Sequence, residues 1–101
     1  MTVSAVSVRI DAKTLKDIEF AGRELELDRS EVLRRFLSEA IRQFKIKKAL
    51  ELLGQRRVSV GKAAEIAEIS IYELMELADR SGIELDYSIQ DLEKDIARFR
   101  L

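Results

Sequence analysis

The sequence has no cysteine and no histidine, which excludes disulfides, thiol nucleophiles, imidazole bases and the usual zinc ligands together. Proline and tryptophan are also absent, and no apolar run approaches the ~20 residues that a membrane helix needs. The N-terminus lacks the basic and then apolar order of a signal peptide. We therefore expect a cytoplasmic protein with no membrane segment, metal or cofactor, and with few groups suited to catalysis.

Charged residues form 37% of the chain and are unevenly distributed. Residues 1–57 hold 13 basic and 9 acidic side chains, a net charge of +4, whereas residues 58–101 hold 5 and 10, a net charge of −5. This asymmetry predicts an anionic partner for the first half and a basic or apolar one for the second. Because a chain of 101 residues makes one domain or two very small ones, help from a partner chain is also expected.

The stretch "VSVRID" predicts a short strand over 6–11, because apolar residues alternate there with polar ones. A helix over 12–25 is predicted next. No second strand of comparable quality follows, so this strand would need a partner from elsewhere.

Polar residues that can cap a helix, each followed by apolar residues at helical spacing, divide the rest of the chain into helices. The predicted N-caps are Asp11, Asp28, Ser59, Ser70 and Ser88. The helix after Asp28 is long, and its apolar stripe changes phase near Ile46, which indicates passage from one core to another. Gly54 is its expected end, and the segment after it separates two predicted domains, 1–53 and 54–101.

In order and spacing, residues 4–45 resemble the ribbon-helix-helix DNA-binding fold of MetJ/Arc-type repressors. The matching segments are "SVRID", "L..I...G..L" and "LDRSEVLRRFLSEAI". The resemblance implies a mainly α, intertwined homodimer, held together by the N-terminal strand and the long helix and followed by a small helix-turn-helix-like C-terminal domain. In such a dimer the paired strands enter the major groove of double-stranded operator DNA.

The same resemblance assigns residues to DNA contacts. Base contacts are expected from Ala5, Ser7 and Arg9, because an arginine can fork onto guanine and a serine can donate or accept. Phosphate contacts are expected from Arg29 and Ser30 at the start of the long helix, where unbonded N–H groups attract anions. Two residues depart from the family pattern: Ala5, where a longer polar residue is commoner, and Asp28, whose charge repels a phosphate. The side chains of Lys45, Lys47 and Lys48 either add phosphate contacts or form an exposed helix face.

The second half, with "SVGKAAEIA" followed by "YELMELADRSGIELDYSIQDLEKDI", is similar to a small prokaryotic family of antitoxin-like proteins. This resemblance implies an antitoxin encoded beside a PIN-domain ribonuclease toxin. Residues 86–101 would then occlude the toxin through the apolar anchors Leu92, Ile96 and Phe99. Alternatively, this tail packs on its own domain or on its dimer mate. The segment 59–82 also has helix-turn-helix character, but its second helix presents acidic side chains that suit DNA poorly.

These patterns together predict a sequence-specific DNA-binding transcriptional regulator, the antitoxin of a toxin–antitoxin pair, which represses its own operon and neutralises a PIN-domain toxin. The alternative is a free-standing ribbon-helix-helix repressor whose C-terminal domain serves oligomerisation or protein interaction. An enzyme is disfavoured, because the carboxylates are scattered over predicted helix faces and no glycine-rich phosphate loop is present.

Overall fold

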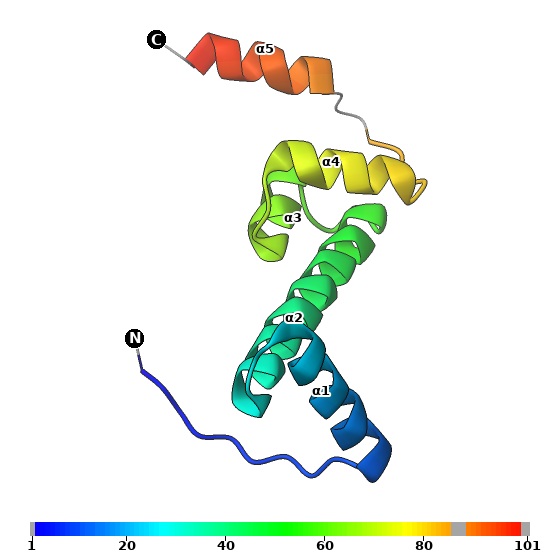
Figure 1. Cartoon of the computed structure of the whole chain (residues 1–101). Coiled ribbons are helices and arrows are strands. Elements are labelled where there is room, and N and C mark those ends of the chain that lie inside the picture. Colours follow the sequence, from blue (N-terminus) through cyan, green and yellow to red (C-terminus); the bar gives the residue numbers. More distant parts are fainter. Residues whose placement is uncertain (1, 86–88, 100–101) are drawn as a thin grey trace. The chain divides into compact units, whose positions relative to one another are not determined.

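A computed structural model describes residues 2–85 and 89–99 of the chain (Figure 1). These residues form five α-helices: α1 (Ala12–Leu25), α2 (Arg29–Gly54), α3 (Val60–Ala67), α4 (Ile71–Arg80) and α5 (Ile89–Phe99). The chain divides into two compact units, Met1–Glu39 and Ala40–Leu101, with the division inside α2. Across the described ranges, no helix combines the length and the apolar character that crossing a membrane requires.

The predicted ribbon-helix-helix fold is wrong, because residues 2–85 and 89–99 contain no β-strand. Residues 2–10 include most of the strand expected over 6–11, but they have no regular secondary structure, and each of them is exposed. A strand is stable only when its backbone N–H and C=O groups pair with a neighbouring strand, and this chain offers no such neighbour in its described part. The alternation of Val6, Val8 and Ile10 therefore leaves their side chains in solvent.

The predicted helix starts are confirmed at four positions. At each one, a side-chain oxygen accepts a hydrogen bond from the backbone N–H three residues further on, at 2.8 to 3.1 Å. These N-caps are Asp11, Asp28, Ser59 and Ser70. The fifth predicted cap, Ser88, lies outside the described residues. Local capping chemistry thus accounts for the starts of α1, α2, α3 and α4.

The first unit has a small core. Among its described residues, only Ile18 on α1 and Val32 on α2 are buried. Gly22 allows α1 to approach the loop that precedes α2, because a Cβ atom at this position would lie 3.0 Å from the carbonyl oxygen of Leu27 and 3.6 Å from Val32. Between α1 and α2 the chain turns at Glu26, which adopts the left-handed conformation with φ of 55°.

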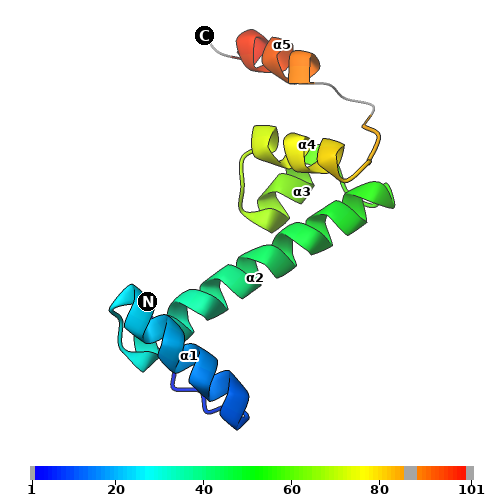
Figure 2. The same ribbon diagram turned by 45° about the vertical axis from the view of Figure 1, so that its right-hand side comes forward.

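The second unit has a larger core, built from the last turns of α2 together with α3 and α4 (Figure 2). Its buried members are five alanines and three large side chains, of which Leu74 is 0% exposed. They are Ile46, Ala49, Leu53, Ala63, Ala64, Ala67, Leu74 and Ala78. The predicted passage of α2 from one core to another is confirmed at its second part, where Ile46, Ala49 and Leu53 are buried, whereas Ile41 and Phe44 just before it are exposed.

Helices α3 and α4 form the predicted helix-turn-helix, and the turn between them is fixed by an unusual residue. Glu68 has φ of 57°, a conformation that glycine adopts more easily, and its backbone N–H donates to the carbonyl oxygen of Glu65. The Glu68 carboxylate accepts a hydrogen bond from Nζ of Lys45 at 3.1 Å. Arg42 and Glu73 form a second ion pair, at 3.6 Å, between α2 and α4.

Candidate interaction surfaces

The predicted base-contacting residues lie in the N-terminal segment. Ala5, Ser7 and Arg9 are all exposed, and no helix or strand fixes the spacing between them. Arg9 therefore has a guanidinium that a nucleic acid can reach, but its direction is not set by a neighbouring element.

The predicted phosphate-contacting residues lie at the start of α2. The Arg29 guanidinium donates to the Glu19 carboxylate at 3.4 Å, and Ser30 is exposed. The Asp28 carboxylate accepts from the backbone N–H of Glu31 at 2.8 Å. The structure thus places Arg29 and Ser30 together at the start of α2, as expected for a phosphate site. The same helix start is already capped by the carboxylate of Asp28, whose negative charge would repel a phosphate.

The strongest positive charge lies further along, in residues 40–57, which we call the basic segment. It holds six basic side chains and one acidic side chain, a net charge of +5, whereas residues 1–39 hold 7 basic and 8 acidic, a net charge of −1. The six are Arg42, Lys45, Lys47, Lys48, Arg56 and Arg57. The net charge of residues 1–57 does not reveal this cluster of basic residues, because the acidic residues of 1–39 offset it. The net charge of each predicted helix, taken separately, would have revealed it.

Not every cation of the basic segment is equally available. Lys45 is paired with Glu68 at 3.1 Å and Lys48 with Glu51 at 3.6 Å. Lys47 and Arg57 are exposed and have no ion-pair partner within residues 2–85 and 89–99. A new anion can therefore approach these two side chains without displacing a carboxylate.

Helix α2 also carries an apolar surface, which we call the α2 stripe. It consists of four large side chains that are about half exposed or more: Phe36 (48%), Leu37 (60%), Ile41 (52%) and Phe44 (68%). Ala40, between them in sequence, is exposed as well. Exposed apolar side chains on consecutive turns of one helix are typical of interaction surfaces.

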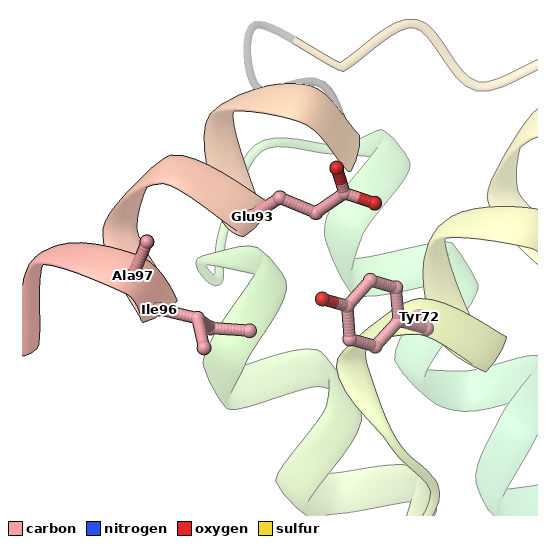
Figure 3. Close-up of a pocket in the computed structure, with 4 residues that line it drawn as sticks. All are labelled: Tyr72, Glu93, Ile96 and Ala97. Atoms are coloured by element: carbon pink, nitrogen blue, oxygen red, sulfur yellow. The ribbon is translucent and has the colours of Figure 1, made fainter. Parts of the chain in front are cut away.

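An open hollow lies between α4 and α5 (Figure 3). It is lined by Tyr72 of α4 and by Glu93, Ile96 and Ala97 of α5, and the Tyr72 ring and the Ile96 side chain point toward each other across it. Of the three predicted toxin anchors, Ile96 is partly exposed here, whereas the side chains of Leu92 and Phe99 lie outside the described residues.

The outward face of α4 is acidic, as expected. Glu73 is paired with Arg42, and Glu76 with Arg80 at 3.8 Å. Because this helix occupies the place of a recognition helix in the helix-turn-helix, its carboxylates disfavour insertion into a groove lined by phosphates.

Comparison with known proteins places most of the chain in one family. The model of the family described as "Uncharacterised protein family (UPF0175)" matches residues 23–100. A UPF0175 protein of Archaeoglobus fulgidus is 46% identical over 48 residues, which cover 48% of this chain and 55% of that relative. A UPF0175 protein of Aeropyrum pernix is 34% identical over 75 residues, which cover 74% of this chain and 84% of that relative. No solved structure matched the chain.

The matched region contains the basic segment, the α2 stripe and the helix-turn-helix, whereas Ala5, Ser7 and Arg9 precede it. The surfaces carried by α2, α3 and α4 are therefore those that the family match includes. On the extent of the match from residue 23 to residue 100, this protein belongs to the UPF0175 family.

Proposed function

We propose that this protein is a transcriptional regulator that binds double-stranded DNA and has no catalytic activity. The observation that carries the proposal is the basic segment, with its net charge of +5 in residues 40–57. Duplex DNA is a dense line of negative charge, and lysine and arginine side chains that replace its condensed counterions supply most of the non-specific affinity. A concentration of cations on one helix and the turn after it suits this role.

Lys47 and Arg57 are expected to contribute most to phosphate binding. Neither has a carboxylate partner in the described part of the chain, so contact with DNA breaks no existing ion pair. Lys45 and Lys48 are held by Glu68 and Glu51, and a phosphate must compete with these carboxylates. Phosphate contacts position a protein on the duplex, whereas base contacts specify the sequence. In this proposal, Arg9 and Ser7 in the exposed N-terminal segment supply the base contacts.

The test is a fluorescence-anisotropy titration with a duplex from the protein's own promoter and with a scrambled duplex, over a series of salt concentrations. We expect tighter binding to the promoter duplex and a steep loss of affinity with salt. The double variant Lys47→Ala/Arg57→Ala should lower the salt slope by about 2, because each phosphate contact contributes roughly 0.9.

A charge-matched control is available outside the basic segment. Lys62→Ala/Arg80→Ala also removes two exposed cations, which pair locally with Glu65 and Glu76, and should leave the salt slope unchanged. Absence of binding at low salt would overturn the proposal. Equal losses in the two double variants would show that net charge, rather than the basic segment, determines binding.

The resemblance of the second half to antitoxin-like proteins extends the proposal to a protein partner, a PIN-domain ribonuclease toxin that this protein neutralises while repressing its own operon. Helix α5 supports this extension, because Ile96 is partly exposed beside Tyr72 at an open hollow. An amphipathic helix laid into an apolar groove is a recurrent mode of protein recognition.

The extension is tested by co-purifying the chain with a PIN-domain nuclease encoded by an adjacent gene and by measuring RNA cleavage. We expect a complex without nuclease activity, weakened by Ile96→Asp and retained in the control Gln90→Asp, which adds the same charge at an exposed position of α5. If no complex forms, the antitoxin role is excluded, and a free-standing repressor remains as the function tested by the DNA titration.

A further inference from the structure

The hollow between α4 and α5 presents three kinds of surface to one ligand. All of its lining residues belong to the second unit, Ala40–Leu101. Tyr72 on α4 contributes an aromatic ring. On α5, Ile96 and Ala97 contribute aliphatic surface, and Glu93 contributes a carboxylate. The Glu93 side chain extends from α5 in the direction of α4 (Figure 3), so that an anion, an aromatic ring and aliphatic surface face the same space.

The Glu93 carboxylate has no cation beside it, unlike five other carboxylates of the second unit. Those five form ion pairs with a lysine or an arginine at 3.1 to 3.8 Å; they are Glu51, Glu65, Glu68, Glu73 and Glu76. In the part of the chain that the structure describes, neither Glu93 nor the Tyr72 hydroxyl has an ion pair or a side-chain hydrogen bond. Residues 58–101 also carry a net charge of −5, which attracts a cation to this side of the protein. The hollow therefore complements a positively charged ligand.

We infer that the hollow binds an arginine side chain of a protein partner. A guanidinium stacks on an aromatic face such as that of Tyr72, and its planar fork pairs with a carboxylate such as that of Glu93. The methylene stem of an arginine covers apolar surface while its head group stays polar, which suits the aliphatic wall at Ile96. A lysine ammonium pairs with the carboxylate as a point charge but lacks the planar face that stacks on the ring.

The open form of the hollow suits a side chain that a protein presents. Pockets for small molecules enclose most of the ligand's surface, whereas this hollow is open to solvent. Arginine and tyrosine are also among the residues that contribute most to the binding energy of protein interfaces. The inference rests on the proposed role of α5 in binding a protein partner, and it adds the chemistry of the residue that the partner presents.

The first experiment titrates the native, isotope-labelled chain with the peptide acetyl-Gly-Leu-Arg-Leu-Gly-amide and follows the backbone amides by NMR. We expect the Tyr72 and Glu93 signals to shift and to saturate as peptide is added. A peptide with citrulline in place of arginine has a neutral group of the same shape and should bind at least about tenfold more weakly. The lysine peptide should also bind more weakly. Neither DNA nor a nuclease is present, so this result is independent of the DNA titration and of the co-purification.

Variants of the two polar lining residues assign the binding to the hollow. Glu93→Gln should lower affinity for the arginine peptide about tenfold. Glu84→Gln removes the same charge from an exposed position outside the hollow and should bind the peptide as the native chain does. Tyr72→Leu should weaken binding, because it removes the aromatic face, whereas Tyr72→Phe keeps the face and should retain binding.

Four results would overturn the inference. The first is the absence of binding by the arginine peptide, and the second is equally tight binding of the citrulline or lysine peptide. The third is an equal loss in Glu93→Gln and Glu84→Gln, which would mean that net charge rather than the hollow determines affinity. The fourth is equally tight binding of N-acetyl-arginine amide alone, which would identify the ligand as a small molecule.

Discussion

The ammonium group of Lys45 on α2 donates to the Glu68 carboxylate in the α3–α4 turn at 3.1 Å, although 23 residues separate them in the sequence. This contact joins the basic segment to the one residue of the turn that adopts the left-handed conformation. Glu68 therefore affects two properties at once: the charge available to DNA and the strain in the turn.

Replacing Glu68 by glutamine should increase affinity for DNA. The substitution releases Lys45 from its carboxylate partner and removes one negative charge beside the basic segment. We expect a gain of a few-fold in non-specific affinity at low salt, which falls as salt is added. Glu65→Gln, which removes the same charge beside Lys62 on α3, is the control in an anisotropy titration, and an equal gain there would contradict the role of Lys45.

Replacing Glu68 by glycine should stabilise the fold. Glycine adopts a φ of 57° without the steric cost that a side chain incurs, and the exposed ion pair that is lost contributes little. We expect the free energy of unfolding in urea to rise by up to about 1 kcal/mol relative to Glu68→Gln, which loses the same ion pair but keeps the strain. A less stable glycine variant would mean that the conformation of this turn is not strained.

Gly22→Ala should destabilise the first unit. The new Cβ atom would lie 3.0 Å from the Leu27 carbonyl oxygen, which belongs to the backbone and moves only with the loop. We expect a loss of about 1 to 3 kcal/mol in the free energy of unfolding. Gly61→Ala is the matched control, because its new Cβ in helix α3 meets nothing within 4 Å beyond its own helix backbone and alanine favours the helix. If the two alanine variants have the same stability, the close approach at Gly22 carries no energetic cost.

Arg9→Ala should reduce sequence preference more than overall DNA affinity. A guanidinium that forks onto a guanine discriminates against the wrong base by about 1 to 3 kcal/mol, so affinity for the promoter duplex should fall about tenfold or more. Affinity for the scrambled duplex should fall far less. Lys13→Ala, which removes a nearby exposed cation, should weaken binding to both duplexes alike. Equal losses for Arg9→Ala on the two duplexes would exclude base contact.

The cap of α1 should make stability depend on pH in the acid range. Hydrogen bonds from the side chain and the backbone of Thr14 lower the pKa of Asp11 below its ordinary value of 3.8. A lowered pKa means that this carboxylate contributes stability above about pH 3.8, which is lost as the pH falls through the pKa of the folded state.

Asp11→Asn keeps a good capping residue but removes the titration. The difference in free energy of unfolding between wild type and this variant, measured in urea from neutral to acid pH, should be constant at neutral pH and change below about pH 3.8. A difference that stays constant with pH would contradict the capping role of Asp11.

The helices could be predicted because their determinants are local. Ser59 and Ser70 cap helices through bonds that reach only three residues, and apolar spacing marks the faces that Leu53 and Leu74 bury. The strand was predicted from the alternation of apolar and polar residues around Val8. This alternation does not show whether another strand is available to pair with it, so the prediction was less reliable than those of the helices. The alternating pattern is present, but a strand also needs a pairing partner from a distant segment, and the described part of the chain supplies none.

The candidate surfaces were only partly visible in the sequence. The apolar positions of α2 were visible from their spacing, but spacing alone did not separate Phe44, which is exposed, from Ile46, which is buried. The basic segment was obscured because its cations were counted together with the acidic residues of the first unit. Whether a lysine already has a carboxylate partner, as Lys45 does, depends on chain segments brought together only by folding.

The stretch "SVGKAAEIA" has a structural explanation in the fold. Ser59 caps α3, and Ala63, Ala64 and Ala67 fill the interior of the second unit where larger side chains have no room. The small residues of this stretch thus serve the packing of three helices, whereas Lys62 and Glu65 are exposed and pair with each other. Because the interior of this unit depends on small side chains, its outward positions are open to substitution, so that its surface can change while its fold stays the same.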